Sequence, residues 1–155
     1  MSLSFLNKLD FPKIVNLVEI WQPKIRLDME GYHEPINYVR MNKRGGGLSL
    51  IIHESLRFRK YEIINQMAFS QLEKIALEIT ENNGKKFLLI SCYRAPNSNL
   101  KKSFEELEKL LEKAHLSQLP VIFTGDMNVN LNKHDHTSKN YTDQGLLKIW
   151  TEHPH

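Results

Sequence analysis

The sequence predicts a mixed α/β sandwich, and three observations indicate it. Short apolar runs recur along the chain as in buried strands, an Asn83-Gly84 pair separates two of these runs, and a helical period lies between the last two. A hairpin followed by a strand–helix–strand unit is typical of a sheet with helices packed on it. With 155 residues, 41% of them hydrophobic and 25% charged, the chain fits one soluble domain, which we expect to span residues 1–155.

The first two strands are expected at residues 14–18 and 48–53. Residues 14–18 form a mainly apolar run bounded by Pro12 and Pro23, as in a strand buried on both faces. Residues 48–53 are rich in Leu and Ile and follow three consecutive glycines, which favour a flexible turn before a core strand.

The next two strands are expected to form a hairpin. The runs 72–80 and 86–92 flank Asn82, Asn83 and Gly84, and Asn-Gly is the strongest short hairpin signal in a sequence. Residues 72–79 taken alone are also compatible with a helix.

A helix is expected over residues 103–115, followed by another strand. Apolar residues recur at helical spacing in this range, and Ser103 with Glu106 has the spacing of a capping box. Pro120 then precedes residues 121–124, which resemble a buried strand that ends at Gly125 and Asp126.

Charge and cysteine content narrow the class of protein. The chain has 21 Lys and Arg against 18 Asp and Glu, a mild excess of +3 that permits a nucleic-acid partner without requiring one. Residues 40–60 carry six of the basic residues and one acid, Glu54, so this stretch is either a solvated face or a surface for backbone phosphates. The one cysteine, Cys92, lies in an apolar run, where we interpret it as a packing residue, and it excludes an internal disulfide.

The location of the protein is expected to be intracellular. No apolar stretch approaches the roughly 20 residues of a membrane-spanning helix, and the first residues lack the pattern of a secretory signal. We therefore expect a nuclear or cytoplasmic protein that is not secreted and has neither a membrane nor a disulfide-linked partner.

Two acidic residues directly follow predicted strands. Glu19 follows residues 14–18, and Asp126 follows residues 121–125 with Asn128 two positions later. A carboxylate at the end of a core strand is held by rigid backbone yet faces the rim, where Mg²⁺ or a substrate can compensate its charge. Residues two apart in an extended segment point the same way, so Asp126 and Asn128 can address one bound group. Either acid is also compatible with being the first polar residue of a loop.

A third segment, residues 91–98, also leaves a predicted strand with polar side chains. Tyr93, Arg94 and Asn97 follow in quick succession, and their phenol, guanidinium and amide groups are types that bind phosphate. Tyr93 is equally compatible with a core aromatic, and Asn97 with an ordinary turn.

Four segments in order along the chain resemble one known family. They are Val18-Glu19-Ile20-Trp21, Gly31-Tyr32 with Arg44-Gly45-Gly46-Gly47-Leu48, Tyr93-Arg94-Ala95-Pro96-Asn97-Ser98, and Gly125-Asp126-Met127-Asn128-Val129-Asn130-Leu131. They resemble the endonuclease domain of non-LTR retrotransposons of the LINE and jockey type, within the endonuclease/exonuclease/phosphatase family. The resemblance implies a four-layer α-β-β-α sandwich like that of deoxyribonuclease I.

The resemblance also implies a phosphodiesterase that nicks DNA with Mg²⁺, for which Mn²⁺ is an alternative. Glu19 and Asp126 would be the metal site, with Asp126 also orienting or deprotonating the attacking water. Asn128 would hold the phosphate or that water, and Tyr93 would contact the scissile phosphate. Substrate phosphate or DNA would be bound further by Arg94, Asn97 and Arg44.

The sequence also departs from the family pattern. The family begins with a strand carrying an asparagine and ends with an aspartate and a Ser-Asp-His motif, and neither end has a counterpart here. We therefore expect an incomplete domain, truncated at both ends, and the alternative is a catalytically inactive remnant that binds nucleic acid or another protein at residues 40–60. A phosphatase acting on small phosphoesters is a third hypothesis. The histidines at 134, 136, 153 and 155 lack a preceding strand to position them, so we do not expect them to be catalytic.

Overall fold

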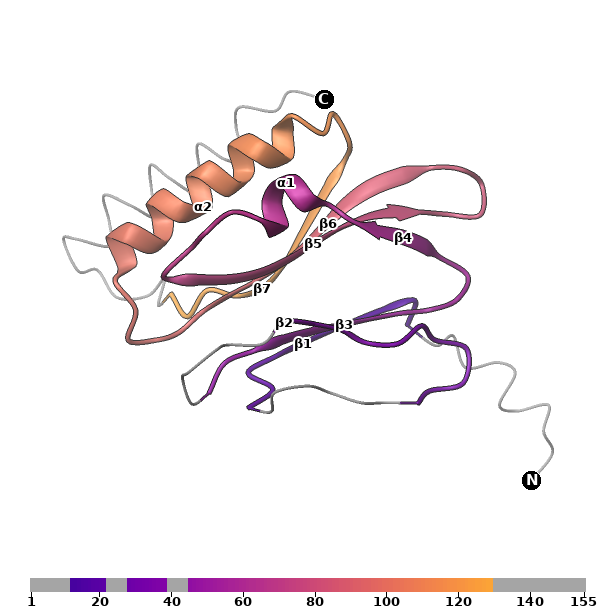
Figure 1. The fold of residues 1–155 in the computed structure, drawn as a ribbon, viewed down its shortest axis with the longest axis horizontal. Coiled ribbons are helices and arrows are strands. Elements are labelled where there is room, and N and C mark those ends of the chain that lie inside the picture. The colour runs from indigo at the N-terminus through magenta and orange to yellow at the C-terminus, as the bar shows by residue number, and fades with distance from the viewer. Residues whose placement is uncertain (1–11, 22–27, 39–44, 130–155) are drawn as a thin grey trace.

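The chain folds into two β-sheets stacked face to face, with helices on the outer face of one sheet (Figure 1). This is a computed structural model, and it describes residues 12–21, 28–38 and 45–129. The three-stranded sheet has the order β1 (Ile14–Val18), β3 (Leu48–Ile52), β2 (Ile36–Tyr38), and its neighbours are antiparallel. The four-stranded sheet has the order β4 (Arg57–Lys60), β5 (Leu72–Thr80), β6 (Lys86–Arg94), β7 (Val121–Asp126).

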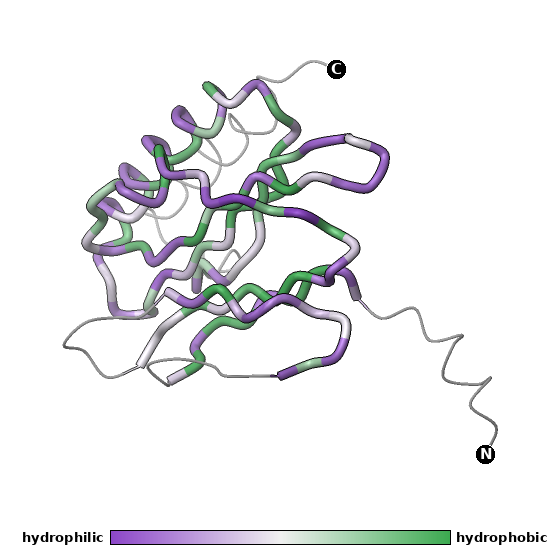
Figure 2. The backbone as a smooth tube through the Cα atoms, turned by 45° about the vertical axis from the view of Figure 1, so that its right-hand side comes forward, coloured by the Kyte–Doolittle hydropathy of each residue, from purple (hydrophilic) through white to green (hydrophobic). Residues whose placement is uncertain are grey.

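The core between the two sheets comes from alternation along the strands. Leu50 and Ile52 of β3 face Leu77 and Ile79 of β5, and all four side chains are fully buried. Because each buried Leu or Ile contributes about 1.5–3 kcal/mol, this layer holds the sheets together. Figure 2 shows these strands as hydrophobic and the tip of the β5–β6 hairpin as hydrophilic.

A second core lies between the four-stranded sheet and the helices α1 (Glu62–Asn65) and α2 (Leu100–His115). On the other face of this sheet, Ala76 of β5 and Leu88 and Ile90 of β6 pack against the helices. Their helix partners are Ile64 of α1 and Leu110 of α2. The described residues therefore form three layers, helices on a sheet on a sheet. None of the helices in these ranges has the length and apolar character needed to cross a bilayer.

The start of α2 differs from the expected capping box. The N-cap is Asn99, whose side chain accepts a hydrogen bond from the Lys102 backbone at 2.9 Å. Ser103 lies inside the helix, where its hydroxyl donates to the Asn99 carbonyl at 2.7 Å. The Glu106 carboxylate does not reach back to the helix start, because it accepts hydrogen bonds from the backbone of residues 70–72.

The expected strands and hairpin are confirmed, with four differences. The strand β1 was expected to be buried on both faces, which is wrong: all five of its residues are half-buried. The hairpin runs β5–β6 as expected, but β6 continues to Arg94, and β3 ends at Ile52. The strand β7 was expected to be buried, which is wrong: it is the outermost of the four described strands of its sheet, and Val121, Ile122 and Phe123 are 38–48% exposed. The short elements β2, β4 and α1 were not expected.

The parallel pairing of β6 and β7 sets up the edge where the two strands end. The helix α2 carries the chain from the end of β6 back to the start of β7, as a parallel pair requires. The register pairs Cys92 with Gly125 and Tyr93 with Asp126. At Gly125 the backbone has φ +134°, and a Cβ there would lie 1.7 Å from the Cys92 carbonyl oxygen, so β7 reaches this register only with glycine.

Candidate active site

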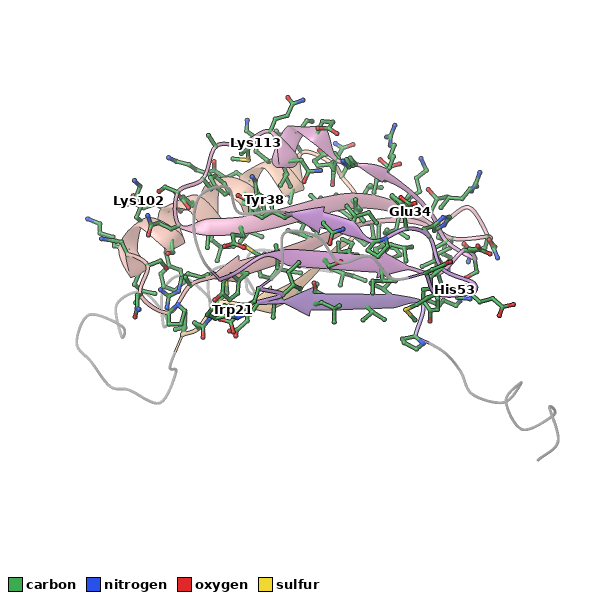
Figure 3. The ribbon with its side chains drawn as sticks, turned by 60° about the horizontal axis from the view of Figure 1, so that its bottom comes forward. Trp21, Glu34, Tyr38, His53, Lys102 and Lys113 are labelled. Atoms are coloured by element: carbon green, nitrogen blue, oxygen red, sulfur yellow. The ribbon has the colours of Figure 1, made fainter. Side chains whose placement is uncertain are left out.

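The ends of β1, β6 and β7 meet at one edge of the sandwich. Asn16 of β1 accepts a hydrogen bond from the Ser91 hydroxyl of β6 at 2.7 Å and donates to the Thr124 hydroxyl of β7 at 3.3 Å. This polar link between the sheets brings Glu19, just after β1, to the same edge as Asp126, the last residue of β7. His53 lies at the opposite end of the strands (Figure 3). Val18, just before Glu19, pairs with Leu48 at the start of β3, whereas His53 follows Ile52 at the end of β3.

Tyr93 connects the two acidic residues. The residue is 2% exposed and its ring belongs to the core between the sheets, while its hydroxyl donates a hydrogen bond to Oε1 of Glu19. Its backbone is the neighbour of Asp126 across the β6–β7 pair. The ring is therefore the core aromatic that was one of the two interpretations, while the phosphate contact of the phenol stays a prediction. The side chains of Glu19 and Asp126 are exposed.

Asp126 and Asn128 form a compact turn after β7. Oδ1 of Asp126 accepts a hydrogen bond from the Asn128 backbone N–H at 2.8 Å, and Asn128 has a left-handed backbone with φ +48°, which asparagine tolerates. The side-chain amide of Asn128 donates to the Arg94 carbonyl oxygen at 2.8 Å. The turn thus holds Asp126 at the strand end with its other carboxylate oxygen accepting no hydrogen bond from the described residues.

Arg94 binds the backbone of this turn through its guanidinium group. The residue is 4% exposed, and its guanidinium donates to the carbonyl oxygens of Met127 at 2.6 Å, Asn128 at 2.7 Å and Ser98 at 3.1 Å. Burial lowers the pKa of the guanidinium, and the nearby charge of Asp126 opposes that shift. These bonds favour a positioning role for Arg94, while the phosphate contact expected from sequence stays a prediction.

Two residues at the edge were missed from the sequence, and both left a signal there. Glu73 lies in β5 beside Tyr93, is 4% exposed, and accepts a hydrogen bond from the Gly47 backbone at 2.6 Å. Asn16 joins the sheets as described above. Asn16 is the one polar residue of β1, and Glu73 alternates along β5 with Ile75, Leu77 and Ile79, which face the core.

The remaining expected residues lie away from this edge or outside the described residues. Asn97 is exposed in the turn after β6, and no role for it is tested. Only the second part of the basic stretch lies in the described residues. Arg57 and Arg59 belong to β4, which is at the other side of the four-stranded sheet from β7, and Arg59 forms a salt bridge with Glu78 at 2.6 Å. Outside the described residues lie the first part of that stretch, including Arg44, and the four histidines near the end, at positions 134, 136, 153 and 155.

The edge fits a hard divalent cation in the kind of ligands it offers. Mg²⁺ binds through one or two carboxylates and completes its shell with water and phosphate oxygens. Glu19 and Asp126 are two such carboxylates, both exposed, and Tyr93 fixes one oxygen of Glu19. Within the described ranges no cluster of three or more His, Cys, Asp or Glu side chains forms a dedicated metal cage.

Comparison with known proteins identifies the fold. No family model matches the sequence, and no curated protein matches it. Among solved structures, the human Nocturnin catalytic domain with bound sulfate anion is similar, with a TM-score of 0.52 at 15% sequence identity. The match covers 87% of this chain and 57% of that one, so the chain spans less than two thirds of its structural neighbour. The likeness confirms the expected fold class, an α/β sandwich built on two stacked sheets.

Proposed function

We propose that this chain is a metal-dependent phosphodiesterase domain that nicks DNA, from the endonuclease part of a non-LTR retrotransposon. The observation that carries the proposal is the position of Tyr93, whose hydroxyl binds Glu19 while its backbone adjoins Asp126. Two carboxylates and a phenol therefore lie near one another where β1, β6 and β7 end. The fold supports the proposal, because the structural neighbour is a catalytic domain of the same fold whose structure contains sulfate, a tetrahedral anion like phosphate.

The charge at the edge explains why a cation would be required. A phosphodiester that approaches Glu19 and Asp126 meets two carboxylates, whose negative charges repel its own. The donors of Arg94 are directed to backbone carbonyls. A divalent ion bound by Glu19 and Asp126 would relieve this repulsion and the negative charge that develops during hydrolysis.

The residues of the chain would then divide the remaining work. The hydroxyl of Tyr93 donates its single hydrogen to the Glu19 carboxylate and so orients it. For the contact with the scissile phosphate that the resemblance implies, this hydrogen would turn from Glu19 to a phosphate oxygen once a cation satisfies the carboxylate. Asp126 has one carboxylate oxygen that accepts no hydrogen bond from the described residues, and this oxygen would orient or deprotonate a water, which is typically worth 10² to 10⁴ in rate. Asn128 would hold that water or the phosphate through its remaining amide hydrogen and its carbonyl oxygen.

The retrotransposon origin rests on the motifs in the sequence. The Arg44-Gly45-Gly46-Gly47 stretch and the Tyr93-Arg94-Ala95-Pro96-Asn97 segment resemble that branch more than phosphatases that act on small phosphoesters. In that branch a nick leaves a 3′-hydroxyl that primes reverse transcription. DNA is therefore the proposed substrate, and Mg²⁺ the proposed cofactor.

The test is nicking of supercoiled plasmid by the purified chain with Mg²⁺. We expect conversion to open circles that stops when EDTA removes the metal and is lost in Asp126→Ala. Glu112→Gln is the matched control, because Glu112 is an exposed acid on α2, on the outer face of the four-stranded sheet, and should nick as the parent does. Nicking no greater than that of Asp126→Ala would reject the proposed activity and leave the nucleic-acid-binding remnant as the explanation.

A further inference from the structure

Trp21 presents an exposed indole beside the candidate active site. It is 69% exposed, the highest value among the large hydrophobic side chains of the described ranges, and it follows Glu19 by two residues. Tryptophan is usually well buried, because its large ring gains much from leaving water. A lone exposed aromatic needs no explanation by itself. Because Trp21 lies close to Glu19 of the candidate active site, its backbone conformation and its ring contacts bear on what binds there.

The backbone holds Trp21 in an unfavourable conformation. Trp21 has φ +52° and Glu19 has φ +54°, both in the left-handed region that side chains with a Cβ rarely adopt. The Trp21 N–H donates to the Gly46 carbonyl at 3.1 Å, which fixes the residue in this conformation. Strained residues of this kind persist where the surrounding structure enforces them, and they concentrate at binding and catalytic sites.

The indole also lies over Gly45, where the positive φ favours glycine and a Cβ would touch the ring. A Cβ at Gly45 would lie 3.3–3.5 Å from Cη2, Cζ3 and Cζ2 of Trp21, so the six-membered part of the ring packs against the bare Gly45 backbone. Gly45 itself has φ +81°. The ring is therefore supported at one place and open over most of its surface. Figure 3 labels Trp21 at the end of the sheets opposite to His53.

We propose that Trp21 is a stacking platform for an unpaired nucleobase next to the phosphate at Glu19, Tyr93 and Asp126, an inference that rests on the proposed function. Two residues span at most about 7 Å of chain, which matches the reach from a phosphate to a base of the same or the next nucleotide. A neutral indole offers nothing to the phosphate and a flat π face to any base. Bases inside an intact duplex are already stacked, so the platform selects single-stranded or extrahelical nucleotides.

Fluorescence of Trp21 provides a direct test. The chain contains two tryptophans, so Trp150→Phe leaves Trp21 as the only reporter. With Asp126→Asn added to suppress cleavage, the protein is titrated in Mg²⁺ with a single-stranded ten-nucleotide oligothymidylate and with an abasic oligonucleotide of equal length. We expect the base-containing strand to quench the emission and the abasic strand to leave it unchanged.

Affinity measurements with variants complete the test. We expect Trp21→Leu to bind the oligothymidylate about tenfold more weakly and the abasic strand as before, and Trp21→Tyr to retain most of the difference. Circular dichroism confirms that these variants fold. Equal quenching by both strands, or equal affinity of the parent and Trp21→Leu for the oligothymidylate, would overturn the stacking role.

The outcome is separable from that of the nicking experiment. Quenching that requires bases in a chain that does not nick would retain the platform and reject the catalytic proposal. Nicking without such quenching would reject the platform alone. A docking surface for another protein would leave the emission unchanged with every oligonucleotide, and this result too overturns the inference.

Discussion

The hydroxyl of Tyr93 donates a hydrogen bond to the carboxylate of Glu19, 74 residues earlier in the chain. This contact joins the two sheets at the edge where the candidate active site lies. Its removal should separate catalysis from folding. In Tyr93→Phe the ring still fills its place in the core, so we expect a loss of stability of about 1 kcal/mol and a fall in plasmid nicking of about tenfold or more. Nicking rates and urea denaturation measure the two effects, and full activity in the phenylalanine variant would contradict the role of the hydroxyl.

Two substitutions at Asp126 distinguish the role of its negative charge from the role of its hydrogen bond to the Asn128 backbone. Asp126→Asn keeps a side-chain oxygen that can accept the hydrogen bond from the Asn128 N–H, whereas Asp126→Ala removes the acceptor as well. We expect both variants to lose nicking by about 10² to 10⁴ and only the alanine variant to lose about 1 kcal/mol of stability. Thermal melting and nicking assays are the measurements. An active Asp126→Asn would show that the charge is not needed.

Gly125 is expected to tolerate no side chain. A Cβ there would lie 1.7 Å from the Cys92 carbonyl oxygen, so Gly125→Ala must break the β6–β7 register or shift β7. We expect a loss on the order of 4 kcal/mol. Gly84→Ala is the matched control. Gly84 also has a positive φ, of +82°, but the added carbon would lie in open space, so we expect a loss of stability of roughly 1 kcal/mol. Equal losses in urea denaturation would show that contact with Cys92 is unimportant.

Glu78 should contribute to the acid sensitivity of the fold. Hydrogen bonds from Arg59 and then Lys86 hold the pKa of its carboxyl below the ordinary value of 4.5, against the opposing effect of burial. Because the pKa is lower in the folded state, the stabilisation is present above the unfolded value and is lost as pH falls through the folded one. Unfolding free energies from pH 7 down to 2 should therefore fall more steeply in the parent than in Glu78→Gln. Parallel curves would contradict this.

Cys92 should react only when the chain opens. It is fully buried, and burial raises the pKa of its thiol to about 12, so the reactive thiolate is scarce in the folded protein. Since it is the one cysteine of the chain, mass spectrometry after iodoacetamide treatment reports its reaction without ambiguity. We expect little labelling at pH 8 and rapid labelling in urea. Rapid labelling of the native protein would show that β6 is accessible.

The sequence predicts the elements whose signal is local. The β5–β6 hairpin has both alternation and an Asn-Gly turn, and α2 has a helical period, so neighbouring residues suffice to identify them. The strands β2 and β4 have no such pattern: β2 has three residues, and β4 is the charged run Arg57–Lys60. Both are strands because they pair with β3 and β5, and this pairing depends on the tertiary structure rather than on the local sequence.

The same distinction applies to the details of α2 and the site. Asn99 and Ser103 both have N-cap chemistry, and the choice between them depends on Glu106, which binds a loop 34–36 residues earlier. Glu19, Tyr93 and Asp126 could be proposed because each ends an apolar run. Their convergence on one edge depends on contacts between sheets, such as the bonds of Asn16, that no local pattern specifies.

The order of the strands divides the molecule along the chain. In the part that the structure describes, the three-stranded sheet is complete by Ile52 and the four-stranded sheet begins at Arg57. Glu19 therefore belongs to the first piece, and Tyr93 and Asp126 belong to the second. A chain cut in the short connection between these pieces would yield two halves that are each without hydrolytic chemistry, and recovery of the Tyr93–Glu19 contact would signal their reassembly.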